Sequence, residues 1–576
     1  MFEIGTGVSD ITAFKKGIGM MGYGMPFNIV KDVETSLSAR AFVVKAASLK
    51  KVVFVNAEMC FITMSVKIGV VKRLQEKYPQ FGYTIDNVLL TAQHTHSGPG
   101  GYSHYAFYNL TIPGFVSEVY EAIVNGIVAA IVQAESTLQP SNIYLNTGFF
   151  EPHLEVAFNR SIKAFNSNPE VSKIDEDKTH LAVDREMTLL RIDGSNGEKR
   201  GMINWFGVHT TSISNDNHKI CYDNKGYASN FFEEDLRSDA QHKNFLAIFA
   251  QGPTGDISPN YIWDEKKKWT RGKFDDDFES ARYNGKLQYE KAKEIYETAT
   301  KNEPLKTEID YALMYVDFSN VQPAVEFTNG QIVQTGSSCH GVSFAEGTAE
   351  GPSVLPPLAF VMRLLARSVK NYEFLKANFI SEVEKNKIYN KYKVQGKKDI
   401  MFETGVGKIF GLQEIKNMPL PSFVDKGLAS IKKQHREGAL KAPWTPEVLP
   451  LQIIIIGELA IAAIPAEITT VAGWRLRDTI HSVLKQRGIN KVILAPYANA
   501  YSGYITTYEE YQHQAYEGGH TVFGEWTLAA YQTKFKELAL QMLKKTEDRK
   551  IDTSVKPVEF SKEELSKRSF SDKKSK

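Results

Sequence analysis

The stretch Val88–Gly101, which reads VLLTAQHTHSGPGG, constrains the fold and the chemistry of this chain more than any other. Its three leading apolar residues predict a buried strand, which runs into two histidines and a glycine-rich turn. His94 and His96 are two residues apart, so an extended backbone would point both imidazoles to the same face. Neutral imidazole is a common zinc ligand, so the stretch is consistent with a metal site at a strand end, although isolated pairs of this kind also lie idle on surfaces.

Other apolar runs end in the same way, with a polar side chain directly after a predicted strand. Met202–His209 alternates apolar side chains and ends in a third histidine. Leu451–Ile464 consists of two apolar runs broken by a glycine and a glutamate, which predicts a buried hairpin, and Glu467 follows it. Glu467 fits either the start of a predicted helix, Ile468–Arg487, or a carboxylate ligand. The residues alone leave both interpretations open.

Three further segments carry candidate functional groups. Arg160 follows a predicted strand and is either an ion-pair partner or a clamp for a carboxylate or oxyanion. Ser258 lies in a turn after the predicted strand Phe245–Ala250, without the Gly-x-Ser-x-Gly elbow of an α/β-hydrolase, so no Ser-His-Asp triad is indicated. Tyr497–Tyr516 contains six tyrosines, a density typical of packing or of a pocket lining.

The pattern of elements predicts an α/β fold with two β-sheets flanked by helices, an αββα-like arrangement of layers. Helical periodicity covers Ser65–Tyr78 and Val116–Glu135, while Ala41–Val44 and Val52–Val55 predict strands. Several candidate ligands follow strands, so we expect the site at one edge of a sheet. The segment Lys370–Gln434 is polar, lysine-rich and poorly periodic, and we interpret it as peripheral insertions.

Charge and cysteine content narrow the class of protein. Of the 576 residues, the part before Leu543 is close to neutral, which gives no reason to expect a nucleic-acid partner. Leu543–Lys576 carries eleven basic and seven acidic residues. It predicts a solvated helix or a disordered end, with peripheral contact to an anionic membrane as the alternative. Three cysteines without metal-type spacing predict reduced thiols.

The N-terminal residues run into predicted structure without a charged and apolar leader. As written, the chain is expected to be cytoplasmic, or to be a mature form whose signal has been removed. The residues do not separate these two cases, and they carry no indication of the oligomeric state.

Taken together, a series of motifs resembles the neutral, non-lysosomal ceramidase family of zinc-dependent amidases, which split ceramide into a sphingoid base and a fatty acid. In chain order the motifs are MMGYGMP, ARAFV, QHTHSGPGG, NRS, DNKGYA, GDISPN, SFAEGT, PAEITTVAGWRLR and YANAYSGYITTYEEYQHQAYEGGHT. They span nearly all of Gly5–Gly524.

The resemblance implies a catalytic role for each candidate residue. One Zn²⁺ per chain would be held by His94, His209, Glu467 and Tyr504. His96 would be the acid/base, Arg160 and Tyr516 would contact the substrate carbonyl or its oxyanion, and Ser258 matches a serine proposed as catalytic. The expected substrate is ceramide or a similar N-acyl lipid. The alternatives are a zinc amidase for another N-acyl lipid or a non-lipid amide, and a non-catalytic lipid-binding relic.

The chain departs from the family pattern in two respects. An immunoglobulin-like domain normally follows the catalytic part, but about fifty residues follow Gly524, fewer than the roughly 100 of such a sandwich. We therefore expect residues 1–540 to form the catalytic domain and 541–576 a charged tail, without that β domain. Pro253 replaces the usual asparagine of the serine motif, a change that bears on the substrate more than on the chemistry.

Overall fold

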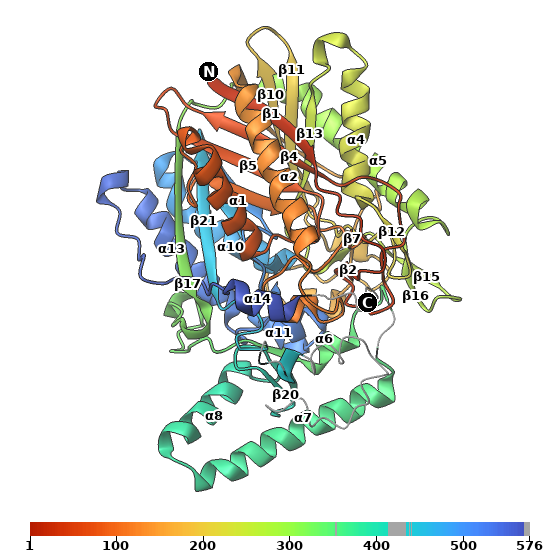
Figure 1. Cartoon of the computed structure of the whole chain (residues 1–576), viewed down its shortest axis with the longest axis vertical. Helices are drawn as coiled ribbons and strands as arrows, with labels where there is room; N and C mark the ends of the chain where they lie inside the picture. Colours follow the sequence, from red (N-terminus) through yellow and green to blue (C-terminus); the bar gives the residue numbers. More distant parts are fainter. Residues whose placement is uncertain (352–353, 413–433, 437, 439, 570–576) are drawn as a thin grey trace.

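The computed structural model describes residues 1–351, 354–412, 434–436, 438 and 440–569. Two β-sheets form the centre of the molecule (Figure 1). In spatial order the larger sheet contains β13 (Leu246–Gln251), β11 (Lys199–Phe206), β10 (Glu186–Gly194), β8 (Gln139–Phe149), β1 (Phe2–Asp10), β4 (Ser38–Lys45), β5 (Lys51–Ala57) and β6 (Val88–Ala92). The smaller sheet contains β17 (Ile309–Asp317), β21 (Val448–Ile456), β22 (Leu459–Ala463) and β24 (Lys491–Ala495).

The two sheets pack face to face through a shared apolar layer. In strand β4 the run Ala41–Val44 is apolar because both of its faces are buried: Phe42 and Val44 pack in the layer between the sheets, while Ala41 and Val43 pack under helices on the other face. A strand that is buried on both faces has no polar side, so its residues form a continuous hydrophobic run instead of an alternating one. The predicted strands and the hairpin of β21 and β22 are confirmed.

Helices cover both outer faces of the sheet pair. The larger sheet is covered by α1 (Met64–Lys77), α2 (Ser117–Ser136), α4 (Asp223–Arg237) and α5 (Asp277–Thr298). The smaller sheet is covered by α10 (Thr470–Leu484) and α13 (Thr527–Met542). The predicted α/β class is therefore confirmed, and α1 and α2 begin and end within one residue of the predicted helices. Among the described residues, no helix is both long and apolar enough to cross a membrane.

The segment Lys370–Gln434, interpreted as poorly periodic peripheral insertions, does lie at the periphery, but its first part is helical. Helix α7 (Pro356–Lys376) continues into it and α8 (Glu382–Gln395) lies within it, at one end of the long axis of the molecule (Figure 1). The pattern gave no helical signal because the apolar residues of α8 do not gather into one stripe. Residues 413–433 of that prediction lie outside the described residues.

The described part of the C-terminal segment is largely exposed and contains a helix, in agreement with the expected solvated helix, but this helix is attached to the body of the protein. Helix α14 (Lys562–Arg568) lies against the body, and the side chain of Arg568 is 2% exposed. The guanidinium of Arg568 donates to the carbonyl oxygen of His104 (2.8 Å). The backbone amide of Phe115 donates to the carbonyl oxygen of Arg568 (2.8 Å). The segment is anchored by its last helix. The three cysteines are free and buried, as predicted.

Candidate active site

Loops that leave both sheets bring the predicted ligands together. His94 follows β6, His209 follows β11, and Glu467 lies in the short strand β23 (Glu467–Ile468) after β22. The expectation that strand ends deliver these side chains is confirmed. The expected extended backbone between the two histidines is wrong, because His94 has a φ of 80°, a left-handed conformation that non-glycine residues rarely adopt. Such strained residues gather at functional sites.

Two imidazoles and one carboxylate form a buried cluster. His94 Nε2 lies 3.5 Å from Glu467 Oε1, and His209 Nε2 lies 3.2 Å from Glu467 Oε2. The ligand atoms of the three residues all lie within 4.8 Å of one another, and each side chain is at most 3% exposed. Two histidines and a carboxylate are a common protein ligand set of catalytic zinc sites, which leave a further position for water.

The backbone fixes the orientation of both imidazoles. His94 Nδ1 lies 2.6 Å from the carbonyl oxygen of Cys60, and His209 Nδ1 lies 2.7 Å from that of Ile257. A carbonyl oxygen can only accept, so each Nδ1 carries the proton and each Nε2 keeps its lone pair toward Glu467. Burial also lowers the pKa of His94 to about 4, which keeps the ring neutral. Metal-binding histidines usually have their second nitrogen held in this way, so the residues fit a zinc ion.

Tyrosines surround the carboxylate. The hydroxyl of Tyr501 donates to Glu467 at 2.5 Å and that of Tyr497 at 3.2 Å, and the Tyr497 ring stacks on His94. Tyr504 pairs with Glu467 across the parallel ladder between β23 and β25 (Tyr504–Ile505), so the fourth predicted ligand lies on the neighbouring strand. The density of tyrosines in this segment therefore reflects a polar lining around one buried carboxylate.

A second trio, Cys60, His94 and His96, also has ligand atoms within 4.8 Å of one another. It is less suited to a metal because the thiol of Cys60 lies near His94 Nδ1 (3.7 Å), the nitrogen that the backbone carbonyl already occupies. Burial moreover raises the pKa of the Cys60 thiol well above its usual value, whereas a metal binds the thiolate. The cluster of His94, His209 and Glu467 is the better candidate.

His96 is at the edge of the cluster and is half-buried. Its Nε2 lies 3.1 Å from His94 Nε2, and the Tyr23 ring meets it edge-on. Gly22 lies directly beneath it: a Cβ at this position would come within 2.4 Å of the imidazole. The MMGYGMP motif thus provides a surface on which the ring can lie. Burial, followed by the nearby histidines, lowers the pKa of His96, so the ring is neutral and able to accept a proton.

Arg160 is held by four acceptors on its guanidinium. It donates to Glu517 (2.9 Å), Glu350 (2.8 Å), the carbonyl oxygen of Gly255 (2.8 Å) and the hydroxyl of Tyr504 (3.1 Å). The guanidinium also lies 5.6 Å from the centre of the Tyr516 ring. The interpretation of Arg160 as an ion-pair partner is confirmed, and its role as a clamp for an oxyanion stays a prediction.

Ser258 is completely buried, and no described histidine nitrogen bonds to its hydroxyl. Its hydroxyl donates to Glu350 (2.6 Å) and accepts from the amide of Asn260 (2.9 Å). Glu350 also accepts from Arg160 and from Thr211 (3.0 Å), so this carboxylate joins the serine to the arginine. Sequence reasoning missed Glu350. Its only signal is its place in the glycine-rich loop that follows SFAEGT.

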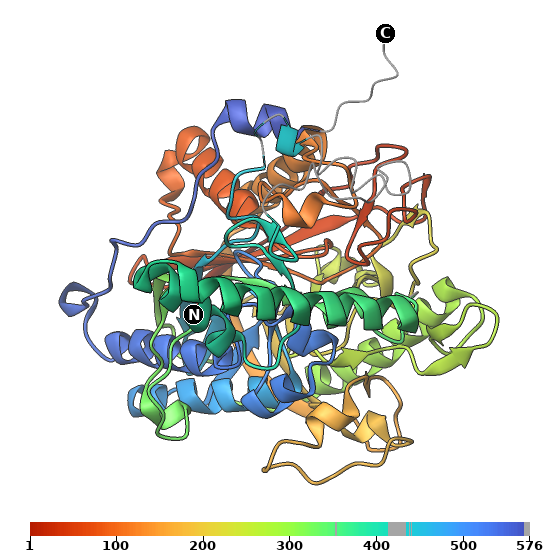
Figure 2. The same cartoon turned by 90° about the horizontal axis from the view of Figure 1, so that it is seen from below.

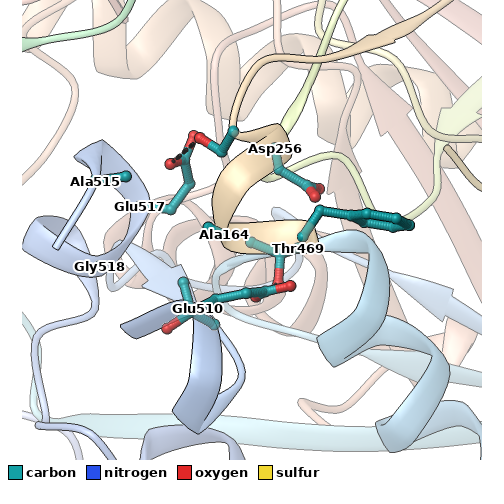
Figure 3. Close-up of a pocket in the computed structure, with 10 residues that line it drawn as sticks. Ala164, Asp256, Thr469, Glu510, Ala515, Glu517 and Gly518 are labelled. Atoms are coloured by element: carbon teal, nitrogen blue, oxygen red, sulfur yellow. Dashed lines mark hydrogen bonds between the residues drawn. The ribbon is translucent and has the colours of Figure 1, made fainter. Parts of the chain in front are cut away.

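A small cavity is lined by Glu517, one of the carboxylates that hold Arg160 (Figure 3). Three carboxylates, Asp256, Glu510 and Glu517, lie on its walls, and Ser161 donates to Glu517 (2.7 Å). Burial raises the pKa of Glu510 to about 8. The volume of about 10 Å³ is close to that of a single water molecule, so the cavity does not admit a substrate. It belongs to the polar support behind the site.

Comparison with known proteins gives a consistent result. The family model described as "Neutral/alkaline non-lysosomal ceramidase, N-terminal" matches residues 2–417 and 432–533. The chain belongs to this ceramidase family. Membership confirms the resemblance seen in the motifs and makes the chain a hydrolase that acts on amide bonds.

Individual ceramidases match along nearly the whole chain. The neutral ceramidase of Pseudomonas aeruginosa is 36% identical over 545 residues, which cover 94% of this chain and 72% of the relative. The crystal structure of neutral ceramidase from that organism superposes with a TM-score of 0.76 at 33% identity, covering 98% of this chain and 77% of the other. A structure described as ceramidase complexed with C2 gives a TM-score of 0.78 at 34% identity, with 97% and 77% covered.

Proposed function

We propose that the chain is a zinc-dependent amidase that hydrolyses the N-acyl bond of ceramide to a sphingoid base and a fatty acid. The observation that carries the proposal is the buried cluster of His94, His209 and Glu467, whose two imidazoles are oriented by backbone carbonyls. Membership of the ceramidase family supports the substrate. One Zn²⁺ per chain would be held by these three side chains, with Tyr504 as the fourth.

Zinc, when bound, lowers the pKa of a water molecule from about 16 to about 7 and so makes hydroxide available at neutral pH. The chain supplies the remaining groups. His96 is neutral, lies 3.1 Å from a ligand nitrogen and is partly accessible, so it can take the proton of the attacking water. The same ring then returns the proton to the leaving amine nitrogen as the C–N bond breaks.

Arg160 and Tyr516 are placed to stabilise the negative charge that develops on the carbonyl oxygen. Their mutual contact, and the carboxylates that hold Arg160, fix both groups before the reaction. Donors that are positioned in advance need not reorganise as charge develops, which is the main source of such stabilisation. Ser258 positions the head group in this account, through the carboxylate of Glu350.

The decisive experiment combines metal content with hydrolysis of a long-chain ceramide by the purified protein. We expect about one zinc per chain, loss of sphingoid-base release in a chelator, and recovery when zinc is added back. His209→Ala should abolish both zinc binding and hydrolysis, whereas His513→Ala, which changes an exposed histidine, should change neither. Stoichiometric zinc in the His209→Ala protein would contradict the ligand assignment.

The same measurements distinguish a ceramidase from a zinc amidase that acts on another N-acyl compound. A protein that binds zinc but leaves ceramide intact would be an amidase for another N-acyl compound, and the search would move to shorter or non-lipid amides. Hydrolysis that resists chelation would instead exclude the metal-dependent route.

A further inference from the structure

We propose that helix α7 docks on a lipid bilayer through its outward apolar face and so brings the active site to the membrane surface. The proposal deepens the proposed function and rests on it, because ceramide carries two long hydrocarbon chains and resides in lipid leaflets. The helix lies across the outside of the molecule, where Figure 2 looks directly onto it.

The outward face of α7 has a composition typical of a buried helix. Leu358, Val361, Leu365 and Tyr372 are spaced by three, four and seven residues, which places them on one stripe of the helix. Their exposed fractions are 54%, 57%, 45% and 65%, and Leu375, on the same side, is 64% exposed. A contiguous exposed stripe of this kind marks an interaction surface, because isolated surface leucines do not form such rows.

The inward face holds α7 on the protein. Met362, Ala366 and Val369 pack in a cluster with Phe107 and Trp444. Beside it, Arg363 pairs with Glu346 and Arg367 pairs with Asp399. The helix is therefore fixed by a few apolar residues and by ion pairs, while most of its large apolar residues are left outside. This is the reverse of the arrangement expected for a helix whose outer face meets only water.

Charge favours a lipid surface over another apolar partner. Between Pro356 and Gln395 the chain carries eight basic and three acidic residues. Several of the basic groups are paired, such as Lys391 with Glu373 and Glu403, so the excess that remains is modest. An apolar stripe bordered by basic side chains is typical of helices that lie in the membrane interface. We expect apolar insertion to dominate and anionic lipid to add a smaller contribution.

Helix α7 is connected to the site through helix α6 (Val342–Glu346). Helix α6 packs on both α7 and α12 (Tyr516–His520). Phe344 of α6 packs in the cluster under α7 and also stacks on Tyr516, with ring centres 5.9 Å apart. The loop between α6 and α7 contains Glu350, the acceptor of Arg160 and Ser258. A membrane on the outer face of α7 would therefore be separated from the groups proposed to receive the lipid amide by α7 and α6.

The test measures sedimentation of the full chain with phosphatidylcholine vesicles that contain no ceramide, so it does not depend on hydrolysis. We expect binding that persists in high salt and increases moderately with phosphatidylserine. Val361→Asp combined with Leu365→Asp should weaken binding about tenfold or more, because two inserted apolar groups become charged. Tyr372→Asp combined with Leu375→Asp, about two turns further along, should have the same effect.

Matched controls are Leu49→Asp and Ile332→Asp, which change apolar side chains that are 75% and 77% exposed and lie outside α7. They should bind vesicles like the parent protein, and thermal unfolding should confirm that all variants are folded. Wild-type protein that stays in solution, or α7 variants that bind normally, would overturn the proposal. A parent dimer that the α7 substitutions convert to monomers would also overturn it, since a second copy would then cover the face.

Discussion

At the scale of single residues, the role of Ser258 distinguishes direct attack of water on the amide from a reaction through an acyl-enzyme. Its hydroxyl donates to a carboxylate and no described histidine nitrogen bonds to it, so it lacks the base that an acyl-enzyme serine requires. We expect Ser258→Ala to keep at least about a hundredth of kcat, whereas removing a true nucleophile typically costs several orders of magnitude more.

The matched control is Ser161→Ala, which removes a hydroxyl donor from Glu517 on the other side of Arg160. Both variants should fall to a similar extent in steady-state hydrolysis, because each loosens one carboxylate that holds the guanidinium. A Ser258→Ala enzyme without measurable turnover, beside an active Ser161→Ala enzyme, would point to the acyl-enzyme.

At the scale of elements, the hairpin of β21 and β22 depends on Gly457. Its φ is +57°, and a Cβ there would lie 2.8 Å from the carbonyl oxygen of Lys306. Gly488, which follows α10, has a φ of +81° but no atom within 4 Å of the same position. We expect Gly488→Ala to lower the free energy of unfolding by about 1 kcal/mol, the cost of the left-handed backbone alone. Gly457→Ala should cost roughly 2–4 kcal/mol, because a backbone clash is added.

Denaturant unfolding of the two variants checks this difference. Equal destabilisation would mean that the chain at Lys306 moves aside without cost. In that case the contact would not define the turn.

The elements that could be predicted from the sequence are those whose apolar residues are buried, because this burial is then visible in the local pattern of residues. Val88–Leu90 and the apolar runs within Leu451–Ile464 are apolar because they lie between layers, so a short window is enough to recognise them. Helix α7 was missed because most of its large apolar residues face outward and only a few pack inward, so its sequence lacks a single core-facing stripe. Glu350 was missed because its role arises from contacts with residues about ninety positions or more away, Ser258 and Arg160.

The candidate site also combines features that the sequence predicts with features that it does not. The ligand types were recognisable as histidines and a carboxylate at strand ends, and the family motifs indicated which ones belong together. The left-handed backbone of His94 and the Tyr501 bond to Glu467 depend on packing between distant segments, which no local pattern encodes.

At the scale of the whole molecule, Asp310 ties the C-terminal segment to the smaller sheet. Its carboxylate is 4% exposed and pairs with Arg549 and with Arg487. Burial by itself would raise the pKa of Asp310, but hydrogen bonds and charge from the two arginines lower it to about 2. The unfolded value is about 3.9, so the pairing stabilises the folded state above that pH, and this stabilisation is lost as the pH falls toward 2.

We therefore expect Asp310→Asn to lower the free energy of unfolding at pH 7 by on the order of 2 kcal/mol. The difference in the free energy of unfolding between variant and parent should become smaller as the pH is lowered from 5 to 3. Urea unfolding at several pH values measures this difference. Asp175→Asn, which breaks an exposed pair with Lys178, should change stability by less than about 0.5 kcal/mol at any pH. A gap that does not depend on pH would show that the charge of Asp310 is not what holds the segment.

The proposed metal ligands are also synthesised in a fixed order. His94 and His209 follow strands of the larger sheet, while Glu467 and Tyr504 come from the segment that contains the smaller one. A chain emerging from the ribosome presents both imidazoles long before the carboxylate exists, and the three meet only when the second sheet has docked on the first. The proposed zinc ion would therefore bind only after the fold is complete, and a stalled or truncated chain would hold the two histidines without a closed site. A bound metal would therefore indicate that the chain is complete and that the two sheets have docked.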